Sequence, residues 1–321
     1  MPIYDKLQLN QKAKELKVVR DTLEKVCRLQ EILRFFDSSE LLRTHLALKG
    51  GTAINLLFFN LPRLSVDIDL DFCQNISREE MLEKREKINL LISKYMTAEG
   101  YTLSPNTKTP HSLDSFVYNY TNSAGMKDNI KIEINYSLRA HILPTQHITV
   151  KSQAFDDEIT VNTVSAMEIY ASKTVALLSR SAARDLYDMN YMIKYGLFDE
   201  SEIEVYRKCV IFYLAVATIS PILEFDFSII ENITPHKITT DLKPVVRDRD
   251  AFDLKIAQKT VIDFLKETII LSEKEKQFLK DFQKGYYHPD LLFDNSEILE
   301  RIASHPMAIW KTNKNRNPQS I

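Results

Sequence analysis

The spacing of hydrophobic residues separates helical from strand-like stretches of the chain. In residues 5–37 the apolar side chains recur every three or four positions, which predicts a helix. Residues 66–72 alternate instead, with Ile68, Leu70 and Phe72 on one side and three aspartates on the other. Because successive residues of a strand point to opposite faces, this stretch is expected to be a strand with one buried face.

Similar patterns predict the elements around this strand. A short strand is expected at residues 46–49, and a buried apolar helix at residues 53–59. Ser77 and Glu80 form a capping box, which begins a helix that reaches about residue 96. The first part of the chain therefore mixes helices and strands.

Three further strands precede a change in the pattern. Residues 114–121 and 129–137 predict a hairpin, and another strand is expected near residues 147–151. Beyond them Ser165 and Glu168 form a second capping box, and helical periodicity continues almost to the end of the chain.

We therefore expect an α+β protein of two domains. Residues 1–160 form the α+β domain, including the N-terminal helices, and residues 161–310 form a mostly helical C-terminal domain. Residues 311–321 contain basic but no acidic residues and are expected to be a disordered tail.

Composition narrows the class of protein. Six glycines in 321 residues argue against a Gly-rich Rossmann fold, and a net charge of -2 means that nucleic-acid binding would need a local basic face. The three cysteines form no CxxC motif, so a reducing compartment fits. The longest apolar run, residues 209–223, predicts a buried helix too short to span a membrane. With no signal-peptide pattern, we expect a cytoplasmic protein without a membrane partner.

Two adjacent glycines mark the first candidate site. Gly50 and Gly51 lie between the predicted strand and the predicted apolar helix. Backbone without Cβ approaches ligands closely, and N–H groups at a helix start suit a phosphate, as does the Thr52 hydroxyl. The plainer interpretation is a tight turn with Thr52 as its N-cap, since the sequence is neither a Walker A motif nor GxGxxG.

Paired carboxylates mark the second candidate site. Asp67 and Asp69 share one face of the predicted strand, where they could bind one divalent cation; without a cation they would repel each other. Asp71 leaves a second pair, Asp69 with Asp71, open. Glu133, on an adjacent strand, would complete a three-carboxylate site for Mg²⁺. A solvated polar strand face is the alternative.

Basic residues supply the third candidate group. Lys173 and Arg180 are seven residues apart, so we expect them on one helical face. Together with Arg63, they are candidate cations for neutralising a triphosphate. Arg184 and Asp188 have the spacing of a surface ion pair, and weak ion pairs on a solvated helix are the alternative for this whole group.

Four short segments keep a characteristic order along the chain. They are Lys49-Gly50-Gly51-Thr52-Ala53, Arg63-x-Ser65-x-Asp67-Ile68-Asp69-Leu70, Lys173-x-x-Ala176-x-x-x-Arg180 and Arg184-Asp185-Leu186-Tyr187-Asp188. Over roughly residues 45–195 this order resembles the AbiEii toxin-like nucleotidyltransferases. The related superfamily often has Gly-Ser where this chain has Gly51-Thr52, which keeps a hydroxyl.

The resemblance implies a fold and a set of roles. The fold is a polymerase-β-like nucleotidyltransferase core, a mixed sheet flanked by helices, with a mostly helical C-terminal part. Asp67 and Asp69 would hold the metals beside Ser65, whose spacing favours this pair, with Glu133 as the third acid. Lys173 would contact the nucleotide, and Asp185 or Asp188 would complete the catalytic set. The expected nucleotide-binding residues are Lys49, Gly50, Gly51, Thr52, Arg63, Ser65 and Arg180.

We therefore expect a Mg²⁺-dependent nucleotidyltransferase that moves a nucleoside monophosphate from an NTP to an acceptor hydroxyl. The resemblance implies the toxin of a toxin–antitoxin or abortive-infection phage-defence pair, with the tRNA 3′ end as acceptor and an antitoxin protein as partner. The alternatives are an enzyme that modifies a protein or small molecule, a module of the same fold that binds a nucleotide or partner without turnover, and a helical interaction protein.

Overall fold

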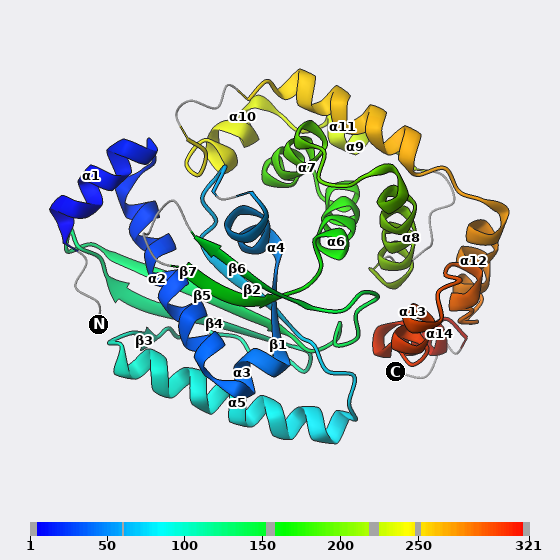
Figure 1. The fold of residues 1–321 in the computed structure, drawn as a ribbon, viewed down its shortest axis with the longest axis horizontal. Coiled ribbons are helices and arrows are strands. Elements are labelled where there is room, and N and C mark those ends of the chain that lie inside the picture. The colour runs from blue at the N-terminus through cyan, green and yellow to red at the C-terminus, as the bar shows by residue number, and fades with distance from the viewer. Residues whose placement is uncertain (1–4, 60, 152–157, 218–224, 248–251, 317–321) are drawn as a thin grey trace. The chain divides into compact units, whose positions relative to one another are not determined.

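The computed structural model describes residues 5–59, 61–151, 158–217, 225–247 and 252–316, in two compact units. Unit 1 comprises Met1–Arg139, Thr145–Val164 and Val245–Asp250. Unit 2 comprises Ala140–Pro144, Ser165–Pro244 and Ala251–Ile321. The change of unit at residues 164 and 165 lies near the expected boundary, and each unit also takes a short segment from the other part of the sequence (Figure 1).

Unit 1 contains every described strand. Its elements are α1 (Lys6–Leu16), α2 (Arg20–Ser38), α3 (Glu40–His45), β1 (Leu46–Lys49), α4 (Gly50–Ala53), the π-helix η1 (Ile54–Phe58), β2 (Asp67–Phe72), α5 (Arg78–Ala98), β3 (Thr102–Leu103), β4 (Leu113–Thr121), β5 (Lys127–Asn135), β6 (Gln146–Lys151) and β7 (Glu158–Thr163).

The strands form one seven-stranded sheet in the order β3-β4-β5-β2-β1-β7-β6. β2 is antiparallel to β1 and parallel to β5, and β1 is parallel to β7. The sheet is therefore mixed, which confirms the predicted α+β class. The hairpin of β4 and β5 and the strand β6 are also confirmed, whereas β3 and β7 were not predicted.

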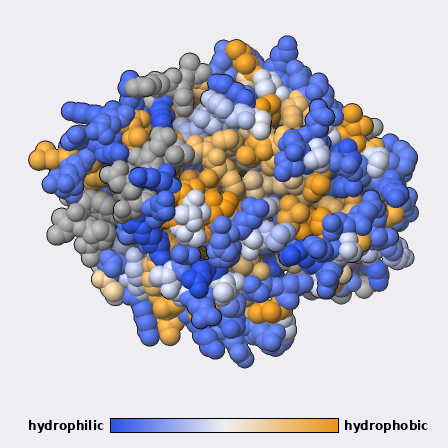
Figure 2. Space-filling view, viewed as in Figure 1, coloured by the Kyte–Doolittle hydropathy of each residue, from blue (hydrophilic) through white to orange (hydrophobic). Residues whose placement is uncertain are grey.

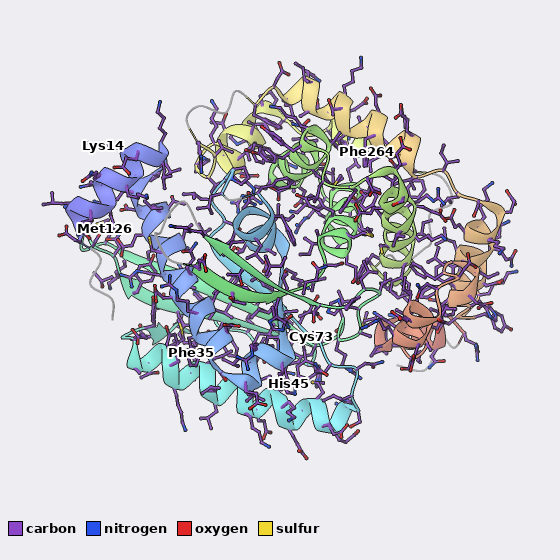
Figure 3. The ribbon with its side chains drawn as sticks, viewed as in Figure 1. Lys14, Phe35, His45, Cys73, Met126 and Phe264 are labelled. Carbon is purple, nitrogen blue, oxygen red and sulfur yellow. The ribbon has the colours of Figure 1, made fainter. Side chains whose placement is uncertain are left out.

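The two faces of the sheet differ in polarity. Ile68, Leu70 and Phe72 of β2 are buried, and the aspartates of the same strand point to the opposite face. α2 and α5 pack together, where the Phe35 ring stacks on the Tyr95 ring with centroids 3.8 Å apart. Figure 3 labels Phe35 on α2. The apolar alternation thus forms the core and leaves a row of carboxylates on the other face.

The predicted N-terminal helix is two helices, so the prediction of one helix over residues 5–37 is wrong. Lys17 has a φ of 56°, and the N–H of Val18 donates to the carbonyl of Ala13. These contacts form a Schellman motif, which ends a helix. Glycine usually occupies the left-handed position, and Lys17 gave no such signal.

Unit 2 is helical in all the elements that the structure describes. They are α6 (Ala166–Ser179), α7 (Ala183–Tyr195), α8 (Glu200–Ala217), α9 (Ser228–Glu231), α10 (Pro235–Lys237), the π-helix η2 (Ile238–Leu242), α11 (Leu254–Thr268), α12 (Glu273–Gln283), the 3-10 helix η3 (Pro289–Leu291), α13 (Ser296–Ile302) and α14 (Pro306–Arg316).

Glu168 is not the second half of a capping box. Ser165 accepts a hydrogen bond from the Glu168 N–H, but the Glu168 carboxylate is fully buried. It accepts hydrogen bonds from the N–H groups of Ile142 and Leu143, both at 2.9 Å, and from the hydroxyl of Tyr213 at 2.5 Å. This carboxylate therefore joins residues 140–144 to the helices of unit 2.

The predicted disordered tail is wrong for residues 311–316, which belong to α14. Their contacts explain the order, because Thr312 is buried and Asn315 donates to the carbonyl of Phe282. Residues 317–321 lie outside the described residues, as do residues 218–224 at the end of the long apolar run. The earlier part of that run lies in α8 and is buried, as predicted.

The surface is mostly polar on the side shown in Figure 2, with hydrophobic residues in separate patches. Within the described part of the chain, no helix combines the length and the apolar character needed to cross a membrane.

Candidate active site

Asp69 is at the centre of the polar face of the sheet. The register of the strands places it opposite Lys49 of β1 on one side and opposite Glu133 of β5 on the other. Asp67 is opposite Lys131 in the same register. The fold therefore brings the three predicted metal ligands, Asp67, Asp69 and Glu133, onto one face of two neighbouring strands.

The electrostatics of this face are unfavourable to ionised Asp69. Burial raises the pKa of its carboxyl, and the nearby Asp67 and Glu133 also raise it; with Lys49 and Lys131 opposing them, the pKa is about 6. A carboxylate with such neighbours is stabilised by an added positive charge. The arrangement is what a cation-binding pair of aspartates requires.

Two lysines already engage two of the other acids on this face. Lys49 Nζ lies 2.5 Å from Asp71 Oδ1, and Asp71 is buried. Lys131 Nζ lies 2.7 Å from Glu133 Oε2. The contact to Lys49 favours the pair Asp67 and Asp69 over the alternative pair Asp69 and Asp71. To bind a metal through Oε2, Glu133 would have to give up its ion pair with Lys131.

Gly50 is packed directly against Asp69. A Cβ built on Gly50 would lie 2.6 Å from Asp69 Oδ2, and the φ of Gly50 is 69°. Both the space and the left-handed backbone therefore require glycine. The first glycine of the pair thus brings backbone next to a predicted metal ligand.

Gly51 and Thr52 contact the loop before β2. A Cβ on Gly51 would lie 2.8 Å from Arg63 Nη2 and 3.0 Å from Ser65 Oγ. The Thr52 hydroxyl donates to the carbonyl of Asp67, and its oxygen lies 3.0 Å from Ser65 Oγ, within hydrogen-bond distance. The residues predicted to bind phosphate, including Arg63 and Ser65, are thus close together in unit 1, beside the aspartates.

Asn55 and the segment at residues 245–246 support this loop, and sequence reasoning missed both. Asn55 Nδ2 donates to the carbonyl of Gly51 at 2.7 Å. The N–H of Leu64 donates to the carbonyl of Val245 at 2.6 Å, and Arg63 forms an isolated β-bridge with Val246. An asparagine inside the apolar run was a usable signal for Asn55, whereas the distant pairing left no local signal.

Gln30 of α2 is a further residue that the sequence reasoning missed. Its side chain is 1% exposed, and among the residues that the structure describes neither of its side-chain polar atoms has a hydrogen-bond partner. It lines a cavity of about 10 Å³ together with Thr52, Asn55 and Ser65. An unpartnered buried amide lowers the stability of a fold, so the cavity under the glycine turn is a locally unfavourable place in unit 1.

The remaining predicted residues form a separate cluster in unit 2. Lys173 on α6 is buried, and its Nζ lies 2.8 Å from Asp185 Oδ1 and 2.9 Å from Asp188 Oδ2. Arg180 Nη2 lies 3.1 Å from the other oxygen of Asp185, and its side chain is 69% exposed. Two carboxylates and two cations thus neutralise one another.

Two expectations about this cluster are wrong. Arg180 does not share a helical face with Lys173, because α6 ends at Ser179 and Arg180 has an extended backbone. Arg184 does not pair with Asp188 in the structure, since its Nε donates to the carbonyl of Asp241 and Asp188 contacts Lys173. Arg180 reaches the cluster from beyond the helix end instead.

The family of this chain follows from the comparison with protein-family models. The model described as "Nucleotidyl transferase AbiEii toxin, Type IV TA system" matches residues 33–284. These residues span both charge clusters. The chain belongs to the AbiEii family of nucleotidyl transferase toxins. The predicted family is therefore confirmed.

A solved structure shows the same fold. The AbiEii-family chain is similar to MenT4, a nucleotidyltransferase toxin from Mycobacterium tuberculosis H37Rv, with a TM-score of 0.63 and 13% sequence identity. The similarity covers 94% of this chain and 99% of the other. A comparison with curated proteins finds no significant match.

The donor atoms of this AbiEii-family chain suit a hard divalent cation, which prefers carboxylate oxygens. Asp67 and Asp69 fit this requirement, because burial and the neighbouring acids raise the pKa of Asp69, and a bound cation would stabilise its ionised form. In the described part of the chain, no three His, Cys, Asp or Glu side chains are placed to hold one metal ion together. Glu133, bonded to Lys131, remains a predicted third ligand.

Proposed function

We propose that this chain transfers a nucleoside monophosphate from an NTP to the 3′ hydroxyl of a tRNA, with Mg²⁺ as the metal, and that it acts as a toxin restrained by an antitoxin. The observation that carries the proposal is the contact between the Gly50 backbone and the Asp69 carboxylate. It puts a candidate phosphate cradle beside a candidate metal site.

The reaction exchanges a phosphoanhydride bond of the NTP for a phosphodiester bond to the acceptor. The acceptor oxygen forms a bond to the α-phosphorus, and the bond from that phosphorus to the bridging oxygen breaks. Pyrophosphate leaves, and the hydroxyl proton passes to solvent. A divalent metal bound by Asp67 and Asp69 would supply Lewis-acid activation of the hydroxyl and stabilise the leaving group.

The chain's own residues would orient the triphosphate. Gly50 and Gly51 begin the helical segment 50–58, whose first N–H groups suit phosphate oxygens. Arg63 and the Ser65 hydroxyl lie against Gly51, where a phosphate held by that backbone would meet them. Thr52 fixes the turn by hydrogen bonding to Ser65 and to the carbonyl of Asp67.

The cations of the cluster in unit 2 would bind a nucleotide by exchanging a carboxylate partner for a phosphate. Lys173 is engaged by two carboxylates, so it would contact a nucleotide only if a phosphate replaced one of them. Arg180 is mostly exposed and could reach a phosphate while its contact with Asp185 is given up at little cost. We propose Arg180 as the first phosphate contact and Lys173 as the second.

A label-transfer assay tests the reaction. Purified protein is incubated with Mg²⁺, total tRNA and each NTP in turn, radiolabelled at the α-phosphate. We expect label on tRNA with the wild type and none with the double variant Asp67→Ala/Asp69→Ala. Replacing Mg²⁺ with Ca²⁺, or adding a chelator, tests the metal.

The other outcomes separate the alternatives. Label on the protein itself would move the acceptor to a side chain. Tight Mg²⁺-dependent NTP binding without product from any acceptor would indicate a binding module. Absence of both binding and transfer would contradict the proposal, provided that the circular dichroism spectrum shows folded protein.

A further inference from the structure

The end of unit 2 carries a basic and aromatic surface that the proposed reaction site does not include. It is formed by the turn at residues 283–288 and by the exposed side of α14, which we call the C-terminal aromatic surface. The C-terminal aromatic surface contains three exposed lysines and arginines, Lys284, Lys314 and Arg316, and its two segments contain no acidic residue, in a chain whose net charge is -2. Figure 1 shows α12, α13 and α14 together at the C-terminal end.

The two segments are held together by specific contacts. Gly285 packs against α14, since a Cβ there would lie 2.8 Å from the carbonyl oxygen of Thr312. Arg316 Nη2 donates to the carbonyl of Gly285 at 2.7 Å, and Asn315 Nδ2 donates to the carbonyl of Phe282 at 3.1 Å. The C-terminal aromatic surface is therefore built on fixed backbone.

Two aromatic rings on this surface are half-exposed and each lies beside a cation. Tyr286 is 51% exposed, with the Arg316 guanidinium 5.1 Å from its ring centre, and Trp310 is 54% exposed, with Lys314 Nζ 5.2 Å from its ring centre. The His288 ring lies parallel to the Tyr286 ring, with centroids 6.4 Å apart.

Large aromatic side chains are usually covered by protein, whereas Tyr286 and Trp310 remain half-exposed to solvent. The helical spacing explains the arrangement on α14, because Trp310 and Lys314 are one turn apart. Lys311, on the other side of the helix, points inward to the carbonyl of Val216 at 3.4 Å. Asp281 and Asp290, the nearest acidic residues along the chain, lie outside the two segments.

Exposed rings with adjacent cations match the chemistry of single-stranded nucleic acid. Every base has a face that stacks on an aromatic ring, and the phosphates between bases require positive charge. A folded protein has no unpaired bases that could stack on the rings, and a bare polyanion would be bound by the cations alone. We propose that the C-terminal aromatic surface binds a single-stranded segment of the acceptor RNA, by stacking on Trp310 and Tyr286 and by phosphate contacts to Lys314 and Arg316.

This inference rests on the proposed function only for the identity of the RNA as acceptor, so binding can be measured without NTP or metal. Trp310 is the only tryptophan of the chain, and its fluorescence therefore reports on this surface alone. An oligoadenylate of about ten nucleotides serves as the probe, long enough for one single-strand site. We expect it to quench the Trp310 fluorescence, and inorganic polyphosphate to leave it nearly unchanged.

Variants separate stacking from charge. Binding of a labelled oligoadenylate, followed by fluorescence anisotropy, should weaken about tenfold or more in Trp310→Ala and much less in Trp310→Phe, which keeps a ring. Lys314→Ala should weaken binding and reduce its salt dependence. Tyr195→Ala is the matched aromatic control, since Tyr195 is 55% exposed beside Lys194 on α7. Lys259→Ala, at an exposed position of α11, is the charge control.

The outcomes distinguish this inference from the proposed function. Unchanged affinity in Trp310→Ala, equal quenching by polyphosphate, or no binding of oligoadenylate would each overturn the inference, whatever the transfer assay shows. Quenching that persists in Asp69→Asn while transfer is absent from the wild type would support the surface and count against the proposed reaction. Thermal unfolding confirms that each variant is folded.

Discussion

The two charge clusters of this chain differ in how far their cations compensate their carboxylates. On the sheet of unit 1, Asp67 and Asp69 face the same side with Glu133 beside them, and the pKa of Asp69 is raised to about 6 by burial and by these acids. In unit 2, Lys173 lies buried between two carboxylates, with an arginine at the exposed edge. Among the described residues, the cluster of unit 1 has more carboxylates than cations, whereas the cluster of unit 2 has two of each.

The difference indicates which cluster needs something from outside. Carboxylates forced together without compensation lower stability, whereas a buried cation with two carboxylate partners is part of what holds the fold. Removing an acid from the first cluster should therefore relieve the fold and abolish function. Removing the lysine from the second should damage the fold itself.

The largest expected effect is on transfer by Asp69→Asn. This change keeps the shape of the side chain and removes a metal ligand, so we expect at least about a thousandfold loss of transfer to tRNA. Asp71→Asn is the matched control on the same strand. Because Asp71 contacts Lys49, its loss should cost about tenfold or less. A loss in Asp71→Asn as large as that in Asp69→Asn would instead place the metal pair at Asp69 and Asp71.

The second prediction concerns the stability of unit 2. Lys173→Met leaves Asp185 and Asp188 buried with one partner fewer, and should lower the free energy of unfolding by about 3–5 kcal/mol. Urea unfolding followed by circular dichroism measures it. Lys276→Met, which removes a surface pair to Glu273, should stay within about 1 kcal/mol. Equal effects of the two changes would remove the contrast between the clusters.

The third prediction is a pH dependence of the metal-free protein. The pKa of Asp69 is raised in the folded state, from 3.8 to about 6. Below about pH 3 the carboxyl is protonated in both the folded and unfolded states and causes no loss. As pH rises from about 4 to 6, the unfolded state ionises first, so the folded state loses stability relative to it.

Asp69→Asn tests this sign directly. The variant should be more stable than the wild type by about 3 kcal/mol at pH 7.5, and equal to it near pH 3. Added Mg²⁺ should raise the stability of the wild type and not of the variant, which removes the difference. A variant that is less stable than the wild type at both pH values would show that Asp69 is not under electrostatic strain.

Much of the first cluster could be predicted from sequence because its signals are local. The alternation in β2 fixed which aspartates share a face, and the two adjacent glycines marked the turn that approaches them. Glu133 was found for the same reason, since its own strand alternates. A period of two residues carries information about faces without knowledge of the fold.

The rest depended on partners far apart in the sequence. Nothing near Lys173 shows that Asp185 and Asp188 neutralise it, and nothing near Arg63 shows that Val246 will pair with it. Lys17 ends a helix without the usual glycine, and so gave no warning. Charged residues at helical spacing predict contacts along one helix. In the structure, Lys173 and Arg63 are instead held by residues of another segment.

The smallest expected effect sharpens the comparison within unit 2. Arg180→Ala removes a cation that is 69% exposed, so its contact with Asp185 is screened by water and should contribute less than about 1 kcal/mol to stability. Asp185 keeps its bond to Lys173. If Arg180 is also the first phosphate contact, the same variant should raise the KM for NTP several-fold while its urea midpoint hardly moves. A large loss of stability with an unchanged KM for NTP would show that Arg180 stabilises the fold and does not contact the nucleotide. The cluster of unit 2 would then lack its proposed first phosphate contact.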